Sequence, residues 1–177
     1  MKKINNFSIV CRSGEAMVMN HSNNKYHMVS DDKGSTVMAS MRMLANLVSK
    51  FKQTEDELNI VFIPRNLGGI LKIDAVEEWI KNGNKTKNGV QLSEEYIELA
   101  KYISDMRKWL GTNNLILKIQ GGDLVSANER ILIDKAWRQL NKVTGVKVSK
   151  VTRPAMKNNS KPVVPSRVMI EEDIELF

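Results

Sequence analysis

Short apolar runs separated by turn residues dominate the first thirty positions of the chain. The runs cover residues 7–12, 16–19 and 26–29, and polar clusters rich in Ser, Gly and Asn lie between them. Runs of this length, bounded in this way, predict three short antiparallel strands.

Helical spacing replaces this pattern after Gly34. Apolar residues recur three or four positions apart from Val37 to Val48, and Ser35 or Thr36 can cap the segment. A near-continuous apolar run then covers residues 58–63 and ends at Pro64. Such a run predicts a central strand that is covered on both faces.

The remaining pattern predicts three more helices and one more strand. The helices cover residues 71–80, 96–110 and 127–142, and the strand covers 115–119. Gly111 is placed to end the second of these helices. The order is three strands, helix, strand, two helices, strand and helix, so we expect an α/β fold. The predicted sheet is mixed and five-stranded, with helices on both faces.

Composition separates a tail from this domain. Residues 147–167 contain six cations, three prolines and no acid. A segment of this kind cannot bury a core, so it is predicted to be extended. We therefore expect a domain over residues 1–144 and a tail over 145–177.

The overall charge and the cysteine content limit the kind of partner and the cellular compartment that we expect. The formal net charge is +7, which favours an anionic partner, nucleic acid before membrane. No apolar run approaches the ~18 residues of a membrane span, and the N-terminus lacks the apolar core of a signal peptide. The single Cys11 fits a reducing cytoplasm.

The segment from 79 to 92, here named the handle, is the most suggestive for function. A helix ending at Trp79 leads into a basic turn containing two glycines, and Ser93 opens the next helix. Such a turn projects cations from a rigid base, as phosphate-binding surfaces do. The alternative is an ordinary solvated loop between helices.

Element order and two local motifs resemble type 1 ribonuclease H. In the handle, Gly83-Asn84-Lys85-Thr86 resembles the Gly-x-Lys-Thr turn of the family's basic protrusion. Gly121-Gly122, followed by Asn128-Glu129-Arg130, resembles the family's Gly-His loop running into Asn-Glu-Arg. The resemblance covers about residues 6–143 and implies the ribonuclease H-like fold.

The family cuts RNA through four carboxylates that hold two divalent metals. None of the four corresponding positions in this chain carries an acidic residue. In chain order, they are occupied by Arg12-Ser13, by Thr36 or Met38, by Pro64-Arg65 and by Leu132. Asp134 lies two positions beyond Leu132, about 200° further around the helix and off the family's face. The resemblance thus implies an inactive domain without a metal or cofactor, in which a cation in the former metal slot binds phosphate directly.

We therefore expect nucleic-acid contacts from the handle and the former metal slot. The candidate residues are Arg12, Arg65, Lys81, Asn82, Lys85, Thr86 and Lys87. The ligand could be RNA, DNA or their hybrid, and a phage or plasmid replication, repair or transcription accessory fits the composition. The alternatives are a protein-interaction adaptor and a metal-dependent nuclease with displaced ligands.

The C-terminal tip suggests a protein partner. Ile174, Leu176 and Phe177 follow three acids at the end of the basic tail. The tip resembles sliding-clamp-binding peptides, without their leading glutamine, and the acidic tips of single-stranded-DNA-binding proteins. It could also fold back on its own domain, either as part of the structure or in competition with nucleic acid.

Overall fold

The computed structural model describes residues 4–51, 58–111, 114–122 and 124–145. Its elements, in chain order, are β1 (Ile4–Arg12), β2 (Glu15–Asn20), β3 (Lys25–Ser30), α1 (Thr36–Phe51), β4 (Leu58–Ile63), the 3-10 helix η1 (Arg65–Leu71), α2 (Ile73–Lys81), α3 (Glu94–Leu110), β5 (Leu115–Ile119) and α4 (Ala127–Val143). The tail, including Ile174, Leu176 and Phe177, lies outside the described residues, so the domain boundary near 144 stays a prediction.

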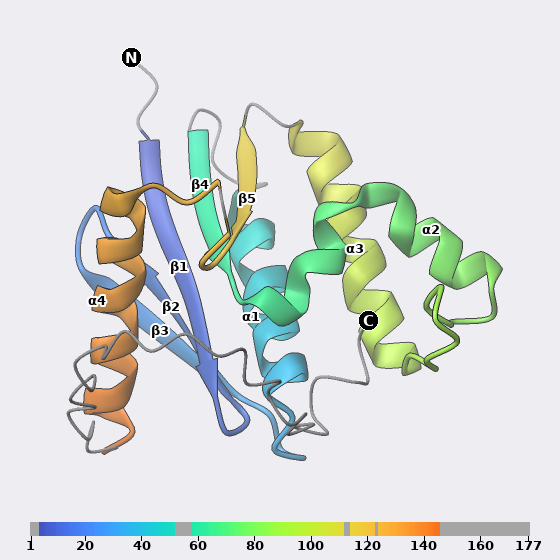
Figure 1. Cartoon of the computed structure of the whole chain (residues 1–177), viewed down its shortest axis with the longest axis horizontal. Helices are drawn as coiled ribbons and strands as arrows, with labels where there is room; N and C mark the ends of the chain where they lie inside the picture. The colour runs from blue at the N-terminus through green and yellow to red at the C-terminus, as the bar shows by residue number, and fades with distance from the viewer. Residues whose placement is uncertain (1–3, 52–57, 112–113, 123, 146–177) are drawn as a thin grey trace, which may run out of the picture.

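The five strands form one mixed sheet in the order β3-β2-β1-β4-β5. β1 is antiparallel to β2, and β2 to β3, whereas β4 and β5 run parallel to β1. Figure 1 shows α4 alone on one face of the sheet and the other helices on the opposite face. The predicted ribonuclease H-like fold, with a mixed sheet and helices on both faces, is confirmed.

Alternation along β1 explains how both faces become buried. Ile9 packs with α1 on one face, and its neighbour Val10 packs with Ala136 and Leu140 of α4 on the other. Successive side chains of a strand point to opposite faces, so one apolar strand supplies both cores. The interior strand β4 does the same through Val61 and the fully buried Phe62, which meets α4 residues.

Capping residues fix where the helices begin and end. The backbone N–H of Met38 donates to Ser35 Oγ at 3.2 Å, which identifies Ser35 as the cap of α1. At the start of α4, Ser126 and Glu129 form a reciprocal capping box. Gly111 ends α3 with a φ of 72°, a conformation that favours glycine.

One helix boundary differs from the prediction. The predicted helix over 71–80 is α2, but it begins at Ile73, and residues before it form η1. In η1, Gly68 and Gly69 approach Ile119 and Trp79 so closely that a Cβ on either would lie 3.0 Å from a side chain. This close packing is a tertiary effect without a clear signal in local periodicity.

No helix in the described part of the chain has the length and apolar character needed to cross a membrane.

Candidate nucleic-acid interface

The handle is a closely hydrogen-bonded loop between α2 and α3. Trp79 O accepts from the N–H groups of Asn84, at 2.8 Å, and Lys85, at 3.2 Å. Further along, the N–H of Leu92 donates to Asn84 O at 2.8 Å, and Lys85 pairs with Gln91 in a short antiparallel bridge. The loop therefore folds back on itself as a small hairpin, which fixes the backbone from which its exposed side chains extend.

Positive backbone angles make this hairpin possible. Gly83 has a φ of 71° and Asn84 a φ of 62°, the left-handed region that glycine and asparagine tolerate best. These two residues turn the chain immediately after α2. The local geometry thus favours the Gly-Asn pair of the sequence motif.

Apolar packing anchors the base of the handle. The rings of Trp79 and Tyr96 lie 6.1 Å apart at 44°, and both residues are buried, as is Leu92. Burial also raises the pKa of the Tyr96 hydroxyl, so this side chain stays neutral. The handle consequently projects from a fixed junction of α2 and α3.

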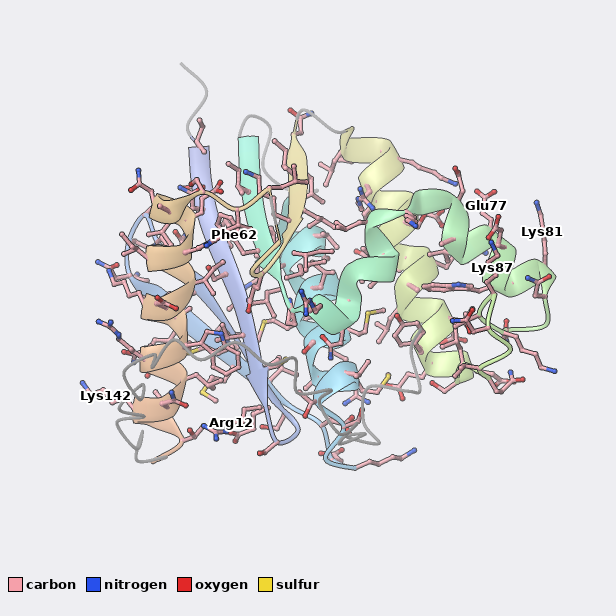
Figure 2. All side chains as sticks on the ribbon, in the orientation of Figure 1. Arg12, Phe62, Glu77, Lys81, Lys87 and Lys142 are labelled. Atoms are coloured by element: carbon pink, nitrogen blue, oxygen red, sulfur yellow. The ribbon has the colours of Figure 1, made fainter. Side chains whose placement is uncertain are left out.

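Four of the predicted handle residues are exposed and one is not. Lys81, Asn82, Lys85 and Lys87 are exposed, and Figure 2 shows Lys81 projecting at the far end of α2. Thr86 is only 6% exposed. Its Oγ1 accepts from the N–H of Val90 at 3.2 Å, so the Thr86 side chain shapes the loop instead of offering a ligand contact.

Ion pairs reduce the acidic field around the handle. Glu77 of α2 pairs with Lys108 of α3, and this hydrogen bond lowers the pKa of Glu77. Glu95 at the start of α3 is bound by Arg42, which also holds the buried Asp31 at 2.8 Å. Acids near the handle are thus partly engaged by helix-to-helix contacts, whereas its lysines face solvent.

The two predicted arginines follow the carboxyl edge, defined here as the ends of β4 and β5 together with the part of β1 that lies beside them. Ser8 pairs with Phe62 in the parallel β1–β4 ladder, and Arg12 and Arg65 follow a few residues after this pair on the two strands. Both arginines are exposed. Arg12 Nη1 donates to Asn141 Oδ1 of α4 at 3.1 Å, which directs its guanidinium toward that helix.

Gln120 joins the three strands at this edge. Its backbone N–H donates to Ile63 O of β4 at 2.9 Å, and its side-chain amide donates to Ile9 O of β1. A pocket of about 420 Å³ opens beside it, lined by Gln120, Gly121, Arg130, Ile133, Asp134 and Trp137. Loop and helix thus form a concave surface next to the strand ends.

Asp134 lies in the lining of this pocket together with Arg130, whereas Leu132 does not line it. The position of the edge loop over α4, which forms the pocket, could not be read from helical periodicity. The prediction that Asp134 lies off the family's metal-binding face stays a prediction. Within the described residues, no three His, Cys, Asp or Glu side chains form a group that could hold a metal ion.

A further cationic surface, the α4 face, was not singled out from the sequence. It consists of the exposed residues Arg130, Lys135, Arg138 and Lys142. Figure 2 shows Lys142 on the opposite side of the molecule from Lys81. Arg138 is three residues from Lys135 and four from Lys142, which places these three on one side of the helix, a signal that the sequence already contained.

Comparison with known proteins adds two solved structures. No protein-family model matches the chain, and no curated protein matches it. A foamy viral protease-reverse transcriptase in complex with an RNA/DNA hybrid has a TM-score of 0.49 and 9% identity over 76% of this chain. A structure of the same viral protein with double-stranded DNA has a TM-score of 0.48 and 10% identity over 76% of this chain. This chain spans 19% of the first structure's chain and 91% of the second's. The fold assignment rests on the strand order and helix placement described above.

Proposed function

We propose that this chain is a nucleic-acid-binding protein of ribonuclease H-like fold that does not cleave its ligand. The observation that carries the proposal is the handle, in which Lys81, Lys85 and Lys87 are exposed on a hydrogen-bonded loop. Lysines held in this way bind phosphates without reading bases. Arg12 and Arg65 at the carboxyl edge extend the same chemistry toward the strand ends.

The residues at the family's four carboxylate positions support the absence of cleavage. Two-metal hydrolysis needs several carboxylates that clamp both cations against the scissile phosphate. Exposed Arg12 and Arg65 repel divalent cations, and Leu132 has no ligand atom in its side chain. Asp134 is a single carboxylate beside Arg130 and does not replace this set.

The ligand class that suits these surfaces is a duplex or an RNA–DNA hybrid. The basic tail over 147–167 adds sequence-independent affinity through its cations. Its acidic tip, with Ile174, Leu176 and Phe177, is proposed to engage a replication protein such as a sliding clamp. An accessory role in replication, repair or transcription of a phage or plasmid is consistent with this arrangement.

Salt titration of binding tests the proposal directly. The wild-type chain and a variant with Lys81→Ala, Lys85→Ala and Lys87→Ala are compared on a DNA duplex and an RNA–DNA hybrid. Three lost phosphate contacts flatten the slope of log K against log salt by up to about three units, equally on all sequences. The charge-matched control carries Lys135→Ala, Arg138→Ala and Lys142→Ala on the α4 face.

The outcomes separate the handle from general charge. We expect the α4 control to change the slope by less than about one unit. Equal slopes for both variants would show that binding depends only on net charge. An unchanged slope for the handle variant would show that the handle is an ordinary solvated loop. Cleavage of the hybrid with Mg²⁺ or Mn²⁺ that disappears on adding EDTA would overturn the absence of activity.

A further inference from the structure

A second pocket lies at the amino end of β1, away from the handle and the carboxyl edge. Its volume is about 350 Å³, and it is lined by Asn5, Phe7, Val18, Asn20, Asn23, Lys25, Tyr26, His27, Leu47 and Lys50. The lining comes from the first three strands, the turn between β2 and β3, and the C-terminal half of α1. Figure 2 shows Arg12 at the other end of β1.

Strand register places three different functional groups in one row of this pocket. Phe7 of β1 lies opposite Asn20 of β2, which in turn lies opposite Lys25 of β3. Neighbouring strands are about 4.8 Å apart, so the backbone positions of Phe7 and Lys25 are about 10 Å apart. An apolar platform, an amide and a cation therefore succeed one another across the sheet.

The polar lining is rich in hydrogen-bond donors. Asn20 Oδ1 accepts from the N–H of Ser22, and Asn23 Oδ1 accepts from the N–H of Lys25, both at 2.9 Å. The turn thus uses the amide oxygens, and the amide NH₂ groups are left to donate. Lys25 and Lys50 add ammonium donors, and none of the lining residues is acidic.

A ligand for this pocket must combine a flat apolar part, acceptor atoms and negative charge. A nucleobase supplies a ring face for Phe7 and acceptors for the amides, and its 5′-phosphate supplies the anion for Lys25 and Lys50. We infer that this pocket binds a nucleotide, either free or as one unit of a single strand. This site is separate from the proposed phosphate contacts of the handle and does not depend on them.

Titration of the full-length chain by amide NMR tests this inference. The probes are guanosine 5′-monophosphate and uridine 5′-monophosphate, with guanosine alone and inorganic phosphate alone for comparison. We expect saturable shifts at Phe7, Asn20 and Lys25 with a Kd of about 1 mM or tighter for at least one nucleotide. Guanosine and phosphate should each bind at least about tenfold more weakly, because each lacks half of the contacts.

Variants identify the groups responsible. Lys25→Ala with Lys50→Ala should weaken nucleotide binding by about tenfold or more, and Phe7→Leu should weaken it while keeping an apolar floor. Lys101→Ala removes an exposed lysine of α3 and should leave the affinity unchanged. Melting curves show that each variant is folded. Absence of saturable shifts, or equal binding of phosphate without a base, would overturn the inference.

Two further probes distinguish the source of the nucleotide. A single-stranded pentanucleotide that binds this pocket more tightly than the mononucleotides assigns it to a strand. If the pentanucleotide binds no more tightly than the mononucleotides, and the mononucleotides still shift the pocket signals, the pocket is assigned to a free nucleotide. The handle variant should keep mononucleotide binding, so failure of the proposed interface is distinguishable from failure of this pocket.

Discussion

The handle and the α4 face both present exposed cations, but they hold them differently. Handle lysines extend from a hairpin whose backbone is bonded at Trp79, Asn84 and Thr86. On α4 the cations follow one side of a regular helix, and Lys135 donates to Asn24 of the β2–β3 turn at 2.6 Å. The helix would keep its shape without them, because its position is fixed by its apolar side.

This difference teaches that cation number alone does not define a nucleic-acid surface. Ordering a long side chain on a phosphate costs about 0.5–1.5 kcal/mol at either surface. What distinguishes the handle is that its lysines lie within a few residues of one another on one hydrogen-bonded loop. The α4 face supplies a more diffuse field that salt screens readily.

After the handle itself, the largest expected effect on the salt slope concerns the carboxyl edge. Replacing Arg12 and Arg65 together by Ala should flatten the salt slope by up to about two units, because both guanidiniums are exposed beside the strand ends. Electrophoretic or anisotropy titrations at several salt concentrations measure this. Asn141→Ala, which removes only the partner of Arg12, is the matched control and should have a smaller effect.

A substitution at Arg12 tests whether the carboxyl edge can support metal-dependent cleavage. Arg12→Asp should weaken binding and should not create Mg²⁺-dependent cleavage, since one carboxylate cannot hold two metals. Hydrolysis by this single variant would show that the edge already contains the remaining ligands, and it would contradict the proposal.

A smaller effect should follow from loosening the handle without changing its charge. Thr86→Val removes the Oγ1 acceptor of the Val90 N–H in a nearly buried position, at a cost of about 1–3 kcal/mol in the free energy of unfolding. Because the lysines lose their fixed base, duplex binding should fall by a few fold. Thr86→Ser retains the hydroxyl and serves as the control. Unchanged binding by a destabilised Thr86→Val variant would show that loop order is irrelevant to affinity.

Much of the fold could be predicted because it depends on local patterns. Alternation in β1, the apolar run of β4 and the Ser35 cap are each visible in a few consecutive residues. Exposure of Lys81 and Lys85 also followed from a polar turn between helices. These features depend on period and turn chemistry, which a sequence displays directly.

The remaining features depend on contacts between distant segments. The buried position of Thr86 results from a hairpin closed by residues on its far side, and the placement of Asp134 results from the loop at Gln120 and Gly121. The pocket at the amino end of β1 requires the register of three strands and the end of α1 together. No local window contains these relations, so periodicity could not supply them.

Acid pH should affect the α4 side of the sheet by a modest amount. Burial, with a further contribution from Lys135, lowers the pKa of His21 from 6.5 to about 4, and His21 Nε2 lies 2.8 Å from Ser8 Oγ. Between these two values the unfolded chain binds the proton more strongly, so stability falls as the pH drops from about 6.5 to 4. Allowing for partial exposure, the loss is about 1–2 kcal/mol.

NMR and denaturation together measure this dependence. Only two histidines are present, so the His21 ring signal can be followed through its titration against that of His27. His21→Gln should remove most of the pH dependence of unfolding over this range. Lys135→Ala should raise the pKa of His21, which would show that one cation of the α4 face has a role within the fold. A His21 pKa near 6.5 in the wild-type chain would contradict the prediction.

The smallest expected effect on nucleic-acid binding concerns the acidic C-terminal tip. Residues 171–177 contain four acids and end in Leu176-Phe177, beyond a basic tail and a domain with cationic surfaces. If the tip competes with nucleic acid for the handle, deleting it should tighten duplex binding by a few fold at low salt, and the effect should fade as salt screens the charges. A variant with Leu176→Ala and Phe177→Ala keeps the acids and is the control for this electrostatic competition.

If the tip instead recruits a sliding clamp, both the deletion and the double-alanine variant should abolish clamp binding, because the two apolar side chains supply most of the buried area. Deletion that alters neither binding but lowers the melting temperature would assign the tip to the fold itself and contradict both proposed roles.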